Sequence, residues 1–176
     1  MLIINKTPAS SLTITTEVVC PNDTNPMGIL QGGRLLQWMD IAAVVCVQVH
    51  AEKICVTASI NHVDFNKTAK VRDIITVNAK ITRAFKTSMK IFVQSFAREV
   101  LAGKFFLISE AYFTFVVLDE NGKSAEVISV SPKTISEKSN MRPHLKEKDK
   151  EQKKIKQACY YHVKEKNKIA VSGRFV

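Results

Sequence analysis

The stretch GGRLLQWMDIAAVVCVQVHA (Gly32–Ala51) decides the fold class of this 176-residue chain. After the two glycines, its length and the Leu, Met and Ala near its start favour an α-helix, although the Val-rich second half is a weaker helix former. Its apolar residues cover nearly every direction around a helix, unlike the single stripe of a surface helix. The pattern therefore predicts one helix that is buried on most sides and has other elements wrapped around it.

Strand-forming segments flank this helix in the sequence. Residues 11–20 alternate in part, and four further segments with strand composition follow the helix: 54–60, 73–85, 88–100 and 105–118. Between residues 75 and 82, apolar and polar side chains alternate one by one, as in a strand with one buried face. No crossover helices separate these strands, so antiparallel hairpins are expected. The sequence predicts an α+β fold, an antiparallel sheet of about five strands wrapped around one central helix.

The charge is unevenly distributed along the chain. The formal net charge is +10, with 13 Lys and Arg against 11 Asp and Glu up to Pro132, and 13 against 5 after it. The two parts therefore carry +2 and +8. We predict a globular domain over residues 1–132 and a basic, Lys-rich C-terminal extension over residues 133–176, partly helical or flexible. The extension could bind nucleic acid or anionic lipid or be a solvated arm, and the acidic residues among its Lys argue against nucleic acid.

Two features exclude classes of protein. The longest segment without a formal charge, residues 41–51, has 11 residues, whereas a membrane-spanning helix needs about 20. The four cysteines are widely spaced and have no His at zinc-finger spacing, so neither a metal site nor a disulfide framework is expected. We therefore expect a cytoplasmic protein with reduced cysteines and without a membrane span.

Asp40 is the single acid within the apolar helix. Its helical neighbours three and four residues away include no cation, so no local salt bridge explains its presence. A carboxylate on a mostly buried helix is costly unless it faces a cleft or finds a distant partner. Asp40 is therefore either a catalytic acid or base at a cleft, or a residue that lies on an exposed stripe of the helix or caps a loop.

Two small residues and a polar loop precede the helix. Gly32 and Gly33 would leave free N–H groups at the positive end of the helix dipole, where a developing oxyanion could bind. A tight turn is the alternative explanation for this pair. In the loop before them, Asn25 and Asp23 are explained most simply as residues of Asx turns.

Three segments together resemble a known family. DTNPMGILQGGRLLQWMD (Asp23–Asp40), NHVDF (Asn61–Phe65) and KTSM (Lys86–Met89) are similar, in order and spacing, to hotdog-fold acyl-CoA thioesterases. The most similar branch is that of cytosolic acyl-CoA hydrolases, which includes bacterial housekeeping and brain-type enzymes. The resemblance covers about residues 12–125. It implies hydrolysis of an acyl-CoA thioester to a free carboxylic acid and CoA, without metal or organic cofactor.

The resemblance also implies roles for individual residues. Asp40 would act as general base or nucleophile, and Asn25 would position water or the thioester carbonyl. The amides of Gly32 and Gly33 would polarise the carbonyl oxygen. In this family the Asn and the Asp of one site come from two hotdog units, so a homodimer is the minimal expected assembly. Hexamers are common in the branch, so a trimer of dimers is expected.

The CoA moiety is expected near the turn that contains Lys86, Thr87 and Ser88, with Lys86 as a phosphate contact. Arg72 is a further candidate for CoA binding. Relatives often have a Pro and a Gly in the loop that contains Arg72, so the shape and charge of this loop stay open.

Two other functions remain open from the sequence. One is a non-catalytic, regulatory hotdog module that binds acyl-CoA, since a fold does not fix a function. The other is a nucleic-acid-binding protein that uses the basic extension. The presence of both Asp40 and Asn25 favours an enzyme over the first, and the mixed charge of the extension argues against the second.

Overall fold

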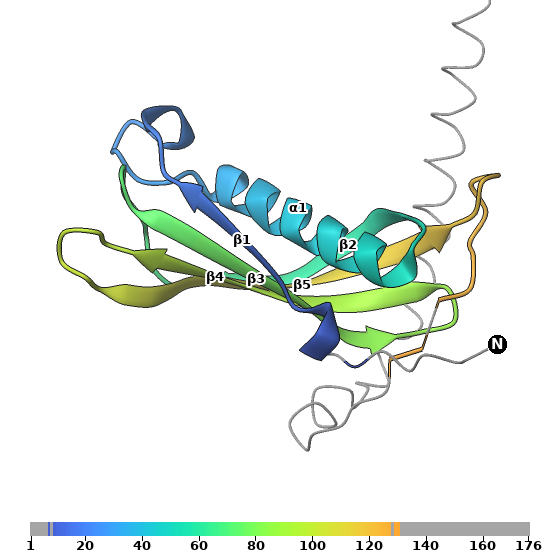
Figure 1. Cartoon of the computed structure of the whole chain (residues 1–176). Helices are drawn as coiled ribbons and strands as arrows, with labels where there is room; N and C mark the ends of the chain where they lie inside the picture. Colours follow the sequence, from blue (N-terminus) through green and yellow to red (C-terminus); the bar gives the residue numbers. More distant parts are fainter. Residues whose placement is uncertain (1–6, 8, 128, 131–176) are drawn as a thin grey trace, which may run out of the picture.

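The computed structural model describes residues 7, 9–127 and 129–130, so the predicted extension 133–176 lies outside the described residues. In chain order the elements are η1 (Ala9–Ser11), β1 (Thr13–Val18), η2 (Pro21–Asp23), α1 (Gly32–Ala51), β2 (Ile54–Phe65), β3 (Ile74–Ala84), β4 (Ser88–Arg98) and β5 (Phe105–Leu118). Figure 1 shows α1 lying across one face of a single curved sheet. The predicted helix and the five predicted strands are all present.

The sheet has the strand order β1-β3-β4-β5-β2, and every neighbouring pair is antiparallel. Strands β3, β4 and β5 form consecutive hairpins in its centre, while β1 and β2 are the two edges. Strand β2 extends five residues beyond the predicted end at Ile60. The register shifts between Thr57 and Ser59 and between Asn61 and Asp64, and such bulges interrupt the alternation from which the strand was predicted.

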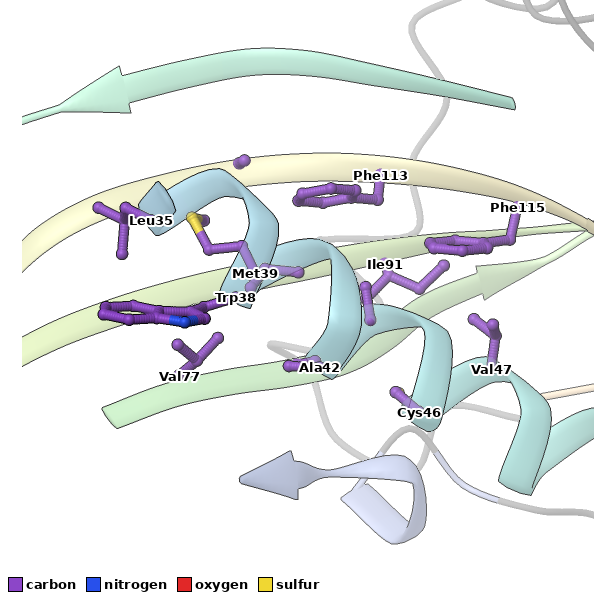
Figure 2. Packing of buried hydrophobic residues seen from close by; sticks show 14 of the residues in the cluster. Leu35, Trp38, Met39, Ala42, Cys46, Val47, Val77, Ile91, Phe113 and Phe115 are labelled. Atoms are coloured by element: carbon purple, nitrogen blue, oxygen red, sulfur yellow. The ribbon is translucent and has the colours of Figure 1, made fainter. Parts of the chain in front are cut away.

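The core fills the space between α1 and the inner face of the sheet. In Figure 2, Leu35, Met39 and Ala42 on α1 face Phe113 of β5 and Ile91 of β4. Met39, Ala42, Ile91 and Phe113 are completely buried, and Leu35 is 4% exposed. Packing of this face holds α1 in place over the centre of the sheet.

The opposite face of α1 is not covered by the sheet. Ile41, Val45 and Val49 follow one another at four-residue intervals on this face and are 50%, 41% and 69% exposed. The prediction of a helix buried on most sides is therefore wrong for the single chain, because one sheet covers only one side of a helix. Also against expectation, Gly32 and Gly33 are the first two residues of α1 itself rather than a turn ahead of it.

Candidate active site

The Asp40 carboxylate lies at the open edge of the sheet. Asp40 is in the third turn of α1 and is partly buried. Its Oδ1 accepts a hydrogen bond of 2.9 Å from Oγ1 of Thr57. Thr57 belongs to β2, which is an edge strand of the sheet. The acid that stood out in the sequence is thus held by a neutral hydroxyl between the helix and an unpaired strand edge.

Thr57 is a candidate site residue that was not predicted from the sequence. The buried Cys55 lies two residues before it on the same strand, so both side chains point toward α1. A polar residue at an inward position of a strand was the available signal. A bulge directly after Thr57 interrupts the alternation and hid this signal.

Asn25 forms the expected Asx turn, and the Nδ2 group of its side chain remains available as a donor. Its Oδ1 accepts hydrogen bonds from the backbone N–H groups of Met27, at 3.0 Å, and Ile29, at 3.2 Å. The backbone N–H of Asn25 donates to the carbonyl of Ile29 at 2.8 Å. Among the described residues Nδ2 has no partner, so the loop fixes the side chain and leaves its donor free.

The N-terminus of α1 has no side-chain cap. Gln31 occupies the N-cap position without capping the helix, and its Nε2 donates instead to the carbonyl of Thr24 at 2.8 Å. The N–H groups of Gly32 and Gly33 precede the first intrahelical bond, which Leu35 donates to Gln31 at 3.0 Å. A β-carbon at position 32 would lie 3.3 Å from the ring of Phe65 on β2, so a larger residue here would have to displace that exposed ring by a few tenths of an ångström.

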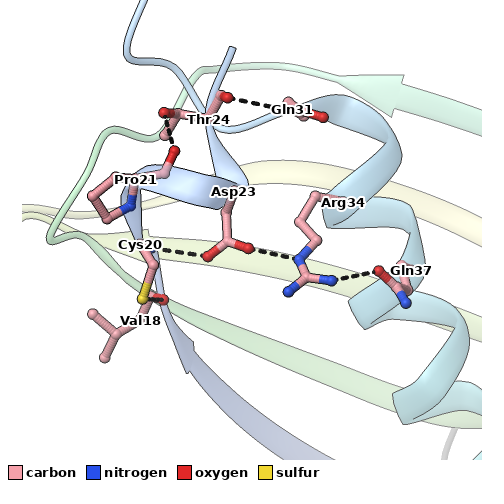
Figure 3. A network of polar contacts seen from close by, with 8 residues as sticks. All are labelled: Val18, Cys20, Pro21, Asp23, Thr24, Gln31, Arg34 and Gln37. Carbon is pink, nitrogen blue, oxygen red and sulfur yellow. Dashed lines mark hydrogen bonds and ion pairs between the residues drawn. The ribbon is translucent and has the colours of Figure 1, made fainter.

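Asp23 connects the Asn25 loop to the helix, as Figure 3 shows. Its Oδ1 accepts a 2.7 Å hydrogen bond from Nε of Arg34, and its Oδ2 accepts one of 2.9 Å from the N–H of Cys20. Asp23 is only 5% exposed. Asp23 does not form the predicted Asx turn: its carboxylate reaches back to the N–H of Cys20 and forms an ion pair with Arg34.

The candidate CoA-binding residues lie at two different places. Lys86 and Thr87 lie in the turn between β3 and β4, and Ser88 is the first residue of β4; the Lys86 side chain is 82% exposed and Ser88 is 2% exposed. Arg72 precedes β3 and therefore lies at its opposite end. The eleven residues of β3 span about 35 Å. One chain does not bring Arg72 and Lys86 together.

Further observations concern metals, membranes and cysteines. No group of three or more His, Cys, Asp or Glu that could hold a metal occurs within the described residues. In the same part of the chain no helix is long and apolar enough to cross a membrane. Cys20 is an exposed free thiol, and Cys46 and Cys55 are buried free thiols; Cys159 lies outside the described residues.

The sequence matches one family. The profile of the Thioesterase superfamily matches residues 27–102. YkhA of Bacillus subtilis (strain 168), described as an uncharacterized acyl-CoA thioester hydrolase, is 34% identical over 127 residues, which cover 72% of this chain and 74% of YkhA. An acetyl-coenzyme A thioesterase of Rattus norvegicus is 37% identical over 111 residues, 63% of this chain. This match covers 20% of the rat protein, so the chain spans about a fifth of that relative's length.

Solved structures have the same fold. An apo-hexameric acyl-CoA thioesterase has a TM-score of 0.77 at 35% identity, covering 84% of this chain and 94% of that one. An acyl-CoA hydrolase of Staphylococcus aureus, in complex with butyryl coenzyme A and coenzyme A, has a TM-score of 0.71 at 30% identity, covering 96% and 99%. Variants of this hydrolase carry Ala in place of an Asn, an Asp or a Thr.

In the S. aureus chain the replaced Asn precedes the Asp by fifteen residues, and the Thr follows it by seventeen. Within the described residues, α1 packed on a five-stranded antiparallel sheet is the predicted hotdog fold. With these matches in sequence and structure, the chain belongs to the thioesterase superfamily, where acyl-CoA thioesterases and hydrolases are its relatives.

Proposed function

We propose that this protein hydrolyses an acyl-CoA thioester to a free carboxylic acid and CoA. The observation that carries the proposal is the Asp40–Thr57 pair, a carboxylate oriented by a hydroxyl at the open edge of the sheet. Asn25 precedes Asp40 by fifteen residues and Thr57 follows it by seventeen, the same spacing as the three residues replaced in the S. aureus hydrolase. This agreement supports a site made of these three side chains.

Two routes use the Asp40 carboxylate. As a general base, Asp40 takes a proton from water while the water oxygen bonds to the thioester carbon; the carbon–sulfur bond then breaks and the CoA thiolate is protonated. As a nucleophile, a carboxylate oxygen bonds to that carbon and expels the thiolate, and water then hydrolyses the anhydride. Thr57 binds Oδ1, which leaves Oδ2 for either step.

Asn25 and the helix N-terminus supply hydrogen-bond donors for the carbonyl oxygen. Because Oδ1 of Asn25 is held by two backbone N–H groups, its Nδ2 is the group that would face water or substrate. The N–H groups of Gly32 and Gly33 lie at the positive end of the helix dipole. Donors of this kind stabilise the oxygen as negative charge develops on it.

The separation of these groups along α1 supports a site shared between two subunits. Gly32 and Asp40 are eight residues apart on one helix, which corresponds to about 12 Å along its axis. A base and an oxyanion donor must both lie within about 3 Å of the reacting groups. We infer that Asp40 of one subunit acts together with Asn25 and the helix N-terminus of another.

The exposed surface offers a place for this second subunit. The apolar stripe of α1 formed by Ile41, Val45 and Val49 is exposed, and within the described residues β2 pairs with no strand on its outer side. Covering both with a second copy would bury apolar surface and pair an edge strand. We propose a homodimer through this face, and the hexameric thioesterase among the similar structures supports a trimer of such dimers.

CoA binding would then involve more than one subunit. We propose that Lys86 contacts CoA phosphates, with Thr87 beside it, because both side chains are accessible. Ser88 is almost completely buried, so in this proposal it contributes through the shape of the turn. Arg72 lies at the far end of β3. In this proposal, Arg72 and Lys86 of one subunit therefore contact CoA molecules in two different sites.

The experiment that tests the function is thiol release from acyl-CoA esters from acetyl- to palmitoyl-CoA. We expect Asp40→Asn to lower turnover of the preferred ester by at least about 10²-fold, because a positioned general base contributes at least that much. Asn preserves the size of the side chain and an acceptor for Thr57. Glu17→Gln is the matched control, since Glu17 is exposed on β1 at the other edge of the sheet.

Near-wild-type turnover in a folded Asp40→Asn protein would contradict the mechanism. Saturable binding of CoA esters by the wild-type protein without thiol release would instead favour a regulatory binding module. Binding of nucleic acid that weakens steeply with salt and requires residues 133–176 would favour a nucleic-acid-binding protein that uses the basic extension.

Subunit mixing tests the shared site. Asn25→Ala should be strongly impaired, as should Asp40→Asn. If the two residues of one site come from different subunits, mixed oligomers of these variants contain some sites with both native residues, and part of the activity should return. A lack of recovery in oligomers shown to be mixed by mass spectrometry would count against the shared site.

A further inference from the structure

Asp23 is a buried anion that joins three parts of the chain around the Asn25 loop. Its carboxylate accepts hydrogen bonds from the N–H of Cys20, after β1, and from Nε of Arg34, in α1. Its backbone carbonyl accepts the N–H of Gln31 at 2.9 Å, at the N-cap of the helix. The ends of the loop are therefore both tied to one residue.

Arg34 is held from several sides as well. Its Nη1 donates to Oε1 of Gln37 at 2.7 Å, and its guanidinium carbon lies 5.6 Å from the centre of the Trp38 ring. The ion pair with Asp23 is short, at 2.7 Å, and the Arg34 side chain is 43% exposed. The guanidinium is thus fixed in one orientation at the start of α1.

The location of this cation is unusual for a helix. Arg34 is the third residue of α1, and the first turn contains no acidic residue. A positive charge near the N-terminus of a helix opposes the helix dipole, whereas a negative charge there is stabilising. Asp23, which comes from the loop rather than from the helix, supplies the compensating negative charge.

This arrangement anchors the helix N-terminus without occupying its amides. A side chain at the N-cap would normally accept one of the free N–H groups, but Gln31 is turned away to the carbonyl of Thr24. The contact from Asp23 is made to a side chain of α1, so the N–H groups of Gly32 and Gly33 have no side-chain acceptor among the described residues. The loop is fixed on both sides of Thr24 and thereby places Asn25.

We propose that Asp23 and Arg34 are positioning residues for thioester hydrolysis, and that their ion pair fixes the Asn25 amide relative to the free amides at the start of α1. The inference rests on the proposed function, because it assigns these groups to the carbonyl oxygen of the substrate. Neither residue touches the substrate; both act through the geometry of Asn25.

The first test is a double-mutant cycle with Asp23→Asn, Arg34→Gln and the double variant. A misplacement of about 1 Å at a reacting group can cost about 10²-fold in rate. We therefore expect each single variant to lose about 10- to 10²-fold in kcat, with KM changed by no more than about twofold. The double variant should lose no more kcat than the more strongly impaired of the two single variants, because the pair acts as a unit. Arg98→Gln is the control, since Arg98 is an exposed arginine at the end of β4.

The second test is chemical rescue. In Arg34→Ala, millimolar guanidinium chloride can occupy the vacated site beside Asp23, so kcat should rise, whereas equal concentrations of sodium chloride should have no effect. Asn25→Ala should not respond to guanidinium. A purely structural role of Arg34 would alter the thermal midpoint but would not produce this selective recovery of kcat.

The outcomes separate this inference from the proposed function. If the wild-type protein releases no thiol from any acyl-CoA, the proposed function fails and this inference fails with it. If Asp40→Asn is impaired but folded Arg34→Gln keeps wild-type kcat, or the losses of the two single variants add, this inference alone is overturned. If Asp23→Asn does not fold, Arg34→Gln and the rescue experiment still test the inference, because the Arg34 side chain is partly exposed and its replacement should leave the protein folded.

Discussion

The hydroxyl of Thr57 determines how the Asp40 carboxylate is oriented. The 2.9 Å hydrogen bond to Oδ1 fixes the rotation of the carboxylate and leaves Oδ2 as the free oxygen. A hydrogen bond to a charged group contributes about 1.5–3 kcal/mol. At this scale, one neutral donor orients the Asp40 carboxylate at the edge of the sheet.

We predict that Thr57→Val lowers kcat of thioester hydrolysis by about tenfold or more, which corresponds to loss of one hydrogen bond to a charged group. Valine has the shape of threonine without the donor, so the fold should be retained. Thr76→Val is the matched control, because Thr76 is on β3 and faces away from α1. Equal kcat for wild type and Thr57→Val, measured by thiol release, would show that Thr57 does not orient Asp40.

Among the elements, the turn before β3 carries a strained residue. Arg72 has a φ of 77°, in the left-handed region, and is the third residue of a turn closed by the N–H of Asp73 and the carbonyl of Lys70 at 3.1 Å. Glycine is favoured at this position of such a turn. The resemblance had already marked this loop as one where relatives often have a glycine.

We predict that Arg72→Gly raises the free energy of unfolding by about 0.5–1 kcal/mol, because relief of the left-handed strain exceeds the added entropy of the unfolded chain. Arg72→Ala removes the same side chain but keeps the strain, so it should give no such gain. Urea unfolding of both variants measures this difference. If Arg72 contacts CoA phosphates, KM should increase equally in both variants.

For the molecule as a whole, two buried thiols link stability to pH. Burial raises the pKa of the Cys46 thiol, which also donates to the carbonyl of Ser11 at 3.0 Å, from 9.0 to about 11. Burial likewise raises the pKa of Cys55 from 9.0 to about 11. In both cases the folded state favours the protonated thiol. Their contribution to stability is therefore complete below pH 9 and is lost as the pH rises toward 11.

We predict that the free energy of unfolding falls between pH 9 and 11 by up to about 1.4 kcal/mol per pH unit for each buried thiol. Urea unfolding at pH 8 and pH 10.5 measures the change. Cys46→Ala should reduce the pH dependence by the share of one thiol, whereas Cys20→Ala should leave it unchanged because Cys20 is exposed. If Cys46→Ala and wild type show the same pH dependence, the Cys46 thiol does not contribute to the loss of stability at high pH.

Some parts of this fold could be predicted from the sequence, and others could not. The helix followed from its length and its content of helix-forming residues. The strands followed from their composition and, in residues 75–82, from the alternation of apolar and polar side chains. The end of β2 and the role of Thr57 did not follow, because two bulges break the alternation there. The Asp23–Arg34 pair also escaped, because its partners are eleven residues apart and meet only when the loop folds back onto α1.

The sequence by itself determined the α+β fold, the single central helix and the unusual position of Asp40, because these follow from local patterns of apolar and charged residues. The tertiary structure decided which face of α1 is covered and that Thr57 holds Asp40. These facts depend on contacts between residues distant in sequence, which a chain acquires only when its strands pair and its helix packs onto the sheet.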